Sequence, residues 1–119
     1  MRRLALAASA LLALTAPAFA GSLDFSLTNA TGYAIDTIYV DEGGKGQWIT
    51  VDLGGKVLED GLTANISFTG EPENCKWDLR VKWSEDYDDT LWQGLNLCNI
   101  HDITLQYDRD KDETTAILK

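Results

Sequence analysis

The chain has 119 residues, with 19 Asp and Glu against 10 Lys and Arg, so its formal net charge at pH 7 is −9. This length fits a single domain, and this charge repels nucleic-acid phosphates and anionic membrane surfaces. We therefore expect no nucleic-acid partner and no membrane insertion, and a cationic protein is the partner that the charge favours.

The first twenty residues predict export. Two arginines precede an apolar run from Leu4 to Thr15, and residues 18–20 read Ala-Phe-Ala, an Ala-x-Ala cleavage signal. The run is too short to cross a bilayer, which takes about 20 residues. We expect a cleavable signal peptide over residues 1–20, one domain over residues 21–119, and a periplasmic or extracellular location after bacterial Sec-type export. Cleavage removes two of the 10 basic residues and none of the 19 acidic ones, which takes the net charge from −9 to −11.

Apolar and polar residues alternate along most of the remaining chain, as in half-buried antiparallel strands. In chain order, the predicted strands cover residues 23–28, 35–40, 49–53, 62–68, 75–83, 90–97, 102–107 and 114–118. Turns rich in Gly, Asp and Asn separate them. Seven or eight short strands predict an all-β fold: an antiparallel β-sandwich, immunoglobulin-like or C2-like in general form, with a small β-barrel as the alternative.

The clearest strand is 75–83, with apolar residues at all odd positions and charged residues at all even ones. This alternation places Trp77 and Trp83 in the core. The following strand, residues 90–97, contains Gly94, which marks a possible β-bulge.

The two cysteines, Cys75 and Cys98, predict a disulfide, because an oxidising compartment favours one and two cysteines are too few for a typical zinc site. If strands 75–83 and 90–97 form a hairpin, the two cysteines meet at its open end. In such a hairpin Val81 lies near Trp92.

Acidic residues gather in two predicted turns, residues 85–89 and 108–113. If the strands beside them alternate in direction, both turns lie at the same end of the domain. Ca²⁺ prefers several carboxylate and carbonyl oxygens from such loops, although neither turn has the full calcium-loop pattern. The candidate metal ligands are Asp86, Asp88, Asp89, Asp108, Asp110 and Asp112. The alternative is that these turns are solvated and keep an acidic domain soluble.

Catalysis has little support in the sequence. His101 is the only histidine, and neither G-x-S-x-G nor H-E-x-x-H occurs. His101 with nearby carboxylates would be the one acid–base set available. We therefore predict a protein that is not an enzyme and has no catalytic residues.

Two aromatic residues that we expect to be exposed are the candidate binding contacts, Trp48 first and Tyr87 second. Trp48 follows a glycine-rich loop, residues 43–46, and Tyr87 lies at the tip of the first acidic turn. Tyr33, after Thr31-Gly32, is a weaker candidate of the same kind.

Several short motifs resemble those of a group of small exported bacterial β-proteins of unknown function. They are Asn-x-Thr-Gly-Tyr at 29–33, Cys-x-Trp-Asp-Leu at 75–79, Asn-Leu-Cys at 96–98 and Ile-Thr-Leu-x-Tyr-Asp at 103–108. The resemblance covers nearly all of the mature chain and implies the fold, since the shared residues are strand cores, a turn and the cysteine pair.

These observations predict a secreted or periplasmic, non-enzymatic binding domain that Ca²⁺ assists through the acidic loops. The alternative function is an acidic inhibitor or accessory protein of a basic secreted enzyme, such as a lysozyme or a protease, because opposite charge speeds association. The sequence implies no cofactor other than this Ca²⁺ and leaves the oligomeric state open.

Overall fold

The computed structural model describes residues 23–68 and 74–119, and the signal peptide predicted over residues 1–20 lies outside them. The described residues form eight strands and no helix, so none of their elements is a helix that could span a membrane. The strands are β1 (Phe25–Ala30), β2 (Ile35–Glu42), β3 (Ile49–Thr50), β4 (Thr63–Ile66), β5 (Lys76–Trp83), β6 (Thr90–Asn96), β7 (Asp102–Asp108) and β8 (Glu113–Leu118).

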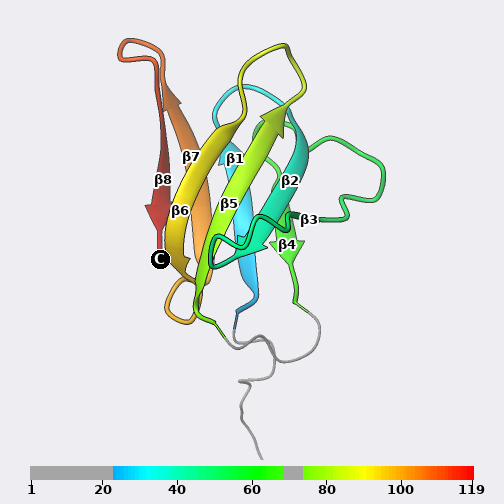
Figure 1. Ribbon diagram of the computed structural model, residues 1–119. Coiled ribbons are helices and arrows are strands. Elements are labelled where there is room, and N and C mark those ends of the chain that lie inside the picture. Colours follow the sequence, from blue (N-terminus) through cyan, green and yellow to red (C-terminus); the bar gives the residue numbers. More distant parts are fainter. Residues whose placement is uncertain (1–22, 69–73) are drawn as a thin grey trace, which may run out of the picture.

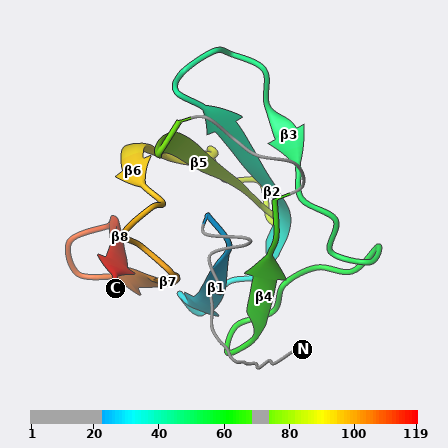
Figure 2. The ribbon, with the colours of Figure 1, turned by 90° about the horizontal axis from the view of Figure 1, so that it is seen from below.

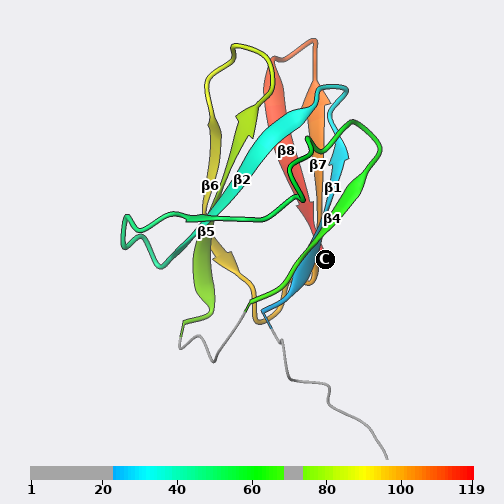
Figure 3. The same ribbon diagram turned by 90° about the vertical axis from the view of Figure 1, so that its right-hand side faces the viewer.

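The strands form two four-stranded sheets that pack face to face. One sheet has the order β4-β1-β7-β8 and the other the order β3-β2-β5-β6. Figure 2, a view along the strands, shows the two layers on either side of the core, and Figure 3 shows them from the side. The predicted β-sandwich is confirmed.

The core lies between the sheets and follows the two-residue period. Leu27, Ile38, Val81 and Ile103 are fully buried, as expected where alternate side chains of both sheets point inward. Trp77 and Trp83 on β5 are also buried, which confirms their predicted place.

One pair of strands departs from the antiparallel expectation. β1 and β7 run parallel, with Ser26 beside Asp102 and Ala30 beside Gln106. After β6 the chain crosses from one sheet to the other, so that β7 pairs with β1 instead of with β6 (Figure 1). The prediction of strand directions was correct, but β7 belongs to the opposite sheet.

The β5–β6 hairpin contains the bulge predicted at Gly94. Its φ is +69°, and its N–H donates a 2.9 Å hydrogen bond to Asp78 Oδ1. The extra residue shifts the register, so that Trp92 pairs with Leu79 and Val81 pairs with Thr90. Val81 therefore does not pair with Trp92, contrary to what the predicted hairpin implied. At the open end Leu97, not Cys98, bonds to Cys75, and the bulge shifts the register by one more residue.

The Cys75–Cys98 disulfide is present, with the two Cα atoms 5.2 Å apart. It closes the open end of the hairpin, as predicted. A disulfide is typical of an oxidising environment outside the cytoplasm.

Candidate functional site

Three loops meet at the end of the sandwich opposite the disulfide. They are residues 31–34 between β1 and β2, residues 84–89 between β5 and β6, and residues 109–112 between β7 and β8. The first acidic turn connects β5 to β6 in one sheet, and the second connects β7 to β8 in the other sheet. Both turns lie at the top in Figure 1. The prediction that they share one end of the domain is confirmed.

These loops surround a pocket of about 460 Å³, here named the tyrosine pocket. Trp83 and three threonines form part of its wall. Its other lining residues are three tyrosines and three aspartates: Tyr33, Tyr87, Tyr107, Asp88, Asp89 and Asp112. The pocket therefore combines aromatic rings with carboxylates.

The three tyrosine rings pack edge to face. The Tyr33 ring lies between the other two, with its centroid 5.7 Å from that of Tyr87 and 5.6 Å from that of Tyr107. The ring planes cross at 83° and 79°, respectively. Such a perpendicular arrangement is a favoured geometry of aromatic pairs. The face of the Tyr33 ring therefore points in a different direction from the faces of the Tyr87 and Tyr107 rings.

Asn29 holds the loop that carries Tyr33. Its fully buried side chain donates from Nδ2 to the carbonyl oxygens of Tyr33, at 2.7 Å, and Leu58, at 2.9 Å. Its Oδ1 accepts from the backbone N and the hydroxyl of Thr31, at 3.1 and 2.7 Å. The Asn-x-Thr-Gly-Tyr motif is thus a side-chain-stabilised turn that places the central ring of the tyrosine pocket.

Two tyrosines of the pocket, Tyr87 and Tyr107, have a pKa above the ordinary value of a phenol. The Tyr107 hydroxyl donates a 2.8 Å hydrogen bond to Asp112 Oδ1, and this bond is the main reason that the pKa of Tyr107 lies above its ordinary value. The negative charge of Glu85 is the main cause that raises the pKa of Tyr87. Arg109 acts weakly in the opposite direction on both phenols, so it is a cation close to the pocket.

The six aspartates predicted as metal ligands do not share one role. Asp88, Asp89 and Asp112 line the tyrosine pocket, whereas the other three do not. Asp108 Oδ1 instead accepts from the backbone N–H groups of Asp110 and Lys111, at 3.0 and 3.3 Å, which stabilises the β7–β8 turn. Within residues 23–68 and 74–119, no three His, Cys, Asp or Glu side chains are grouped so that they could hold a metal ion. Calcium binding stays a prediction.

Trp48, the other predicted binding contact, lies outside the pocket on the outer face of the β2 sheet. The guanidinium of Arg80 sits over its ring at 4.5 Å and over the Tyr39 ring at 4.3 Å. Arg80 Nε also lies 3.7 Å from Asp89 Oδ2. Trp48 is half-buried by this stack, while Tyr87 is 54% exposed at the pocket rim.

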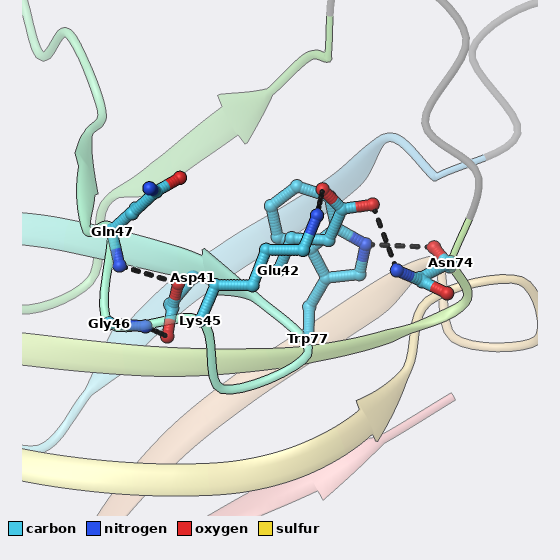
Figure 4. Close-up of polar contacts among 7 residues, drawn as sticks. All are labelled: Asp41, Glu42, Lys45, Gly46, Gln47, Asn74 and Trp77. Atoms are coloured by element: carbon cyan, nitrogen blue, oxygen red, sulfur yellow. Dashed lines mark hydrogen bonds and ion pairs between the residues drawn. The ribbon is translucent and has the colours of Figure 1, made fainter.

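The glycine-rich loop before Trp48 is ordered by its acidic neighbours (Figure 4). The buried Asp41 accepts from the N–H groups of Gly46 and Gln47, at 2.8 and 3.1 Å. Glu42 pairs with Lys45 at 3.2 Å. These three contacts in a short segment order the loop that leads to Trp48, whose ring packs against Arg80.

His101 lies at the other end of the molecule, in the β6–β7 connection. It is exposed, and its Nδ1 is 3.4 Å from the backbone oxygen of Asp24. His101 is not among the residues that line the tyrosine pocket, which lies at the opposite end of the sandwich.

No protein-family model and no curated protein matches this chain. A solved structure, described as the NMR structure of the protein from Eubacterium rectale, is similar to it with a TM-score of 0.57. The match is 15% identical in sequence and covers 87% of this chain and 94% of the other. At this identity the likeness concerns the fold, and it agrees with a β-sandwich.

Proposed function

We propose that this protein is an exported, non-enzymatic binding domain whose tyrosine pocket takes the cationic side chain of a basic protein partner. The observation that carries the proposal is the joint presence of three tyrosine rings and three carboxylates around one pocket. Aromatic faces attract ammonium and guanidinium groups through the ring quadrupole, and carboxylates supply charge-assisted hydrogen bonds.

The charge of the whole chain supports the same ligand. A net charge of −9 raises the local concentration of cations and speeds the encounter with a basic partner. The two turns that flank the pocket carry further carboxylates, including Glu85, Asp86 and Asp110. The carboxylates around the pocket would repel an anionic ligand.

The first test compares a lysine with an uncharged side chain of similar shape. N-acetyl-lysine methylamide and N-acetyl-norleucine methylamide are titrated into isotopically labelled protein, and the NMR signals of Tyr33, Tyr87 and Tyr107 are followed. We expect saturable shifts with the lysine compound that weaken as salt is added, because screening reduces the attraction. Equal shifts with both compounds would contradict the proposal.

Variants locate the interaction in the pocket. Tyr87→Leu removes one ring face, and the loss of a cation–π contact of about 0.5–1 kcal/mol weakens binding roughly 2- to 5-fold. Tyr87→Phe keeps the ring and is the matched control. Arg109→Gln removes a competing positive charge and should tighten binding.

A pair of charge variants separates the effect of a carboxylate in the pocket from the effect of the net charge. Asp88→Asn removes a pocket carboxylate, whereas Asp52→Asn makes the same change outside the pocket and keeps an oxygen for the 2.7 Å bond from Gly54 N. Only the first should weaken binding by more than the small effect of one distant charge. The same titration with Ca²⁺ tests the calcium prediction at Asp88 and Asp112.

The exposed tips of the two acidic turns favour a second candidate, an inhibitor of a basic secreted enzyme. Asp86 and Asp110 are exposed and lie outside the pocket lining, so their carboxylates are free to enter a cationic cleft. Inhibition of a basic lysozyme that Asp86→Asn and Asp110→Asn relieve, and that Tyr87→Leu leaves intact, would favour this candidate over the pocket.

A further inference from the structure

The four edge strands of the sandwich differ in how well they are protected against pairing with another strand. β3 has two residues and β4 has four, and β6 carries the bulge at Gly94. Short edges and bulges are known devices against edge-to-edge association. β8 (Glu113–Leu118) has neither, since it has six residues in unbroken register with β7.

The residues of β8 make it suited to further pairing. Between Glu113 and Lys119 lie only two threonines, an alanine, an isoleucine and a leucine. Ile117 and Leu118 are 41% and 42% exposed. No charged side chain or proline interrupts this stretch, although both commonly guard exposed edges.

The hydrogen bonds to β7 show which backbone groups of β8 face outward. Asp102 and Lys119 exchange both backbone bonds, at 2.9 and 3.0 Å. Because such pairs alternate along an antiparallel ladder, residues 113, 115 and 117 also bond toward β7. The N–H and C=O groups of residues 114, 116 and 118 therefore point away from the sheet.

We propose that this edge pairs with the β8 edge of a second copy of the chain, antiparallel and two-fold symmetric about Ala116. This register places Ala116 opposite Ala116 of the other copy and Thr114 opposite Leu118, so the residues that exchange hydrogen bonds across the interface are those with outward-facing backbone groups. It also places Glu113 opposite Lys119, twice per dimer. The two charged side chains of the segment thus meet partners of opposite sign, whereas a parallel pairing would set Glu113 against Glu113.

The symmetric pairing joins two four-stranded sheets into one of eight strands and covers Ile117 and Leu118. Like residues of one surface patch meet each other, as an isologous two-fold interface requires. Two acidic protomers repel one another, so this repulsion weakens the dimer and salt should reduce the effect. The β8 edge lies along the side of the sandwich (Figure 1), and Thr114 is its one residue that also lines the tyrosine pocket.

The first experiment measures the oligomeric state of the oxidised protein by sedimentation equilibrium over a wide range of concentrations. Glu113→Lys and Lys119→Glu each set like charges opposite one another and should weaken the dimer several-fold, since exposed ion pairs contribute about 0.2–1 kcal/mol each. The double variant E113K/K119E restores opposite charges and should recover the wild-type affinity. A wild-type protein that stays monomeric up to millimolar concentration would overturn the proposal, as would a double variant no better than the single ones.

The second experiment fixes the register. In the symmetric pairing the two Ala116 Cα atoms are about 5.5 Å apart, which is within reach of a disulfide. The matched control is Thr115→Cys, because the two residues 115 are offset along the strands by two positions, roughly 7 Å. We expect Ala116→Cys to form a cross-linked dimer under mild oxidation and Thr115→Cys to stay largely monomeric. Equal cross-linking of both variants, or none in either, would refute the register.

Discussion

At the scale of single residues, Asn29 links the folding of the chain to the geometry of its pocket. Its side chain makes four hydrogen bonds inside the protein, and two of its partners are carbonyl oxygens of distant or loop residues. The residue is fully buried, so water cannot replace these bonds when they are lost. The position of Tyr33 therefore depends on an amide that never touches the pocket itself.

We expect Asn29→Ala to lower the free energy of unfolding by about 2–4 kcal/mol, because it leaves the carbonyl oxygens of Tyr33 and Leu58 without this donor. Asn65→Ala is the control, since Asn65 stands in a similar Asn-x-Ser sequence but is exposed. Its effect should stay within about 0.5 kcal/mol. Urea unfolding of both variants measures the difference, and equal losses would show that the buried amide has no special role.

At the scale of secondary-structure elements, alternation in the sequence was enough to predict nearly every strand. β5 and β7 were the clearest, because their apolar residues recur every second position and their charged residues fall on the other face. β3 was the least well predicted, with only Ile49–Thr50 in place of residues 49–53. That segment has too few inward-facing residues for its pattern to fix its length.

Pairing between strands was harder to predict than the strands themselves. The parallel pairing of β1 with β7 brings together segments about 76 residues apart, and no local pattern in either strand encodes it. The register of β5 with β6 changes by one residue at the bulge that contains Gly94. A glycine within a strand suggests a bulge, but it does not determine the register of the hairpin.

The bulge gives a direct test of this element. Gly94 has a φ of +69°, a conformation that other residues except Asn and Asp rarely adopt. We expect Gly94→Ala to destabilise the protein by about 1 kcal/mol or more, and Gly94→Asn to cost less because Asn tolerates this φ. Thermal unfolding of the two variants gives the order, and an alanine variant as stable as the wild type would mean that the bulge shifts to a neighbouring residue.

At the scale of the whole molecule, the candidate site arises from topology. The sequence singled out Tyr87 and the acidic turns, and it correctly placed both turns at one end. It gave no sign that the Tyr33 ring, from the β1–β2 loop, would lie between the rings of Tyr87 and Tyr107, which come from different sheets of the sandwich. Conversely, Trp48 was a reasonable candidate because it follows a glycine-rich loop. In the fold its ring instead packs against Arg80, 32 positions later in the chain, on the outer face of the sheet.

The disulfide stabilises this arrangement from the opposite end of the molecule. Cys75 and Cys98 are separated by 23 positions, and by loop entropy such a crosslink contributes about 3 kcal/mol through the unfolded chain. We expect the double variant C75A/C98A to unfold at lower urea concentration by an amount that matches this loss. Because the tyrosine pocket lies at the far end of the sandwich, the folded variant should bind the lysine compound with unchanged affinity. A loss of binding in conditions where the variant is still folded would mean that the two ends are coupled, and the β5–β6 hairpin and β7 both reach from the disulfide end to the pocket.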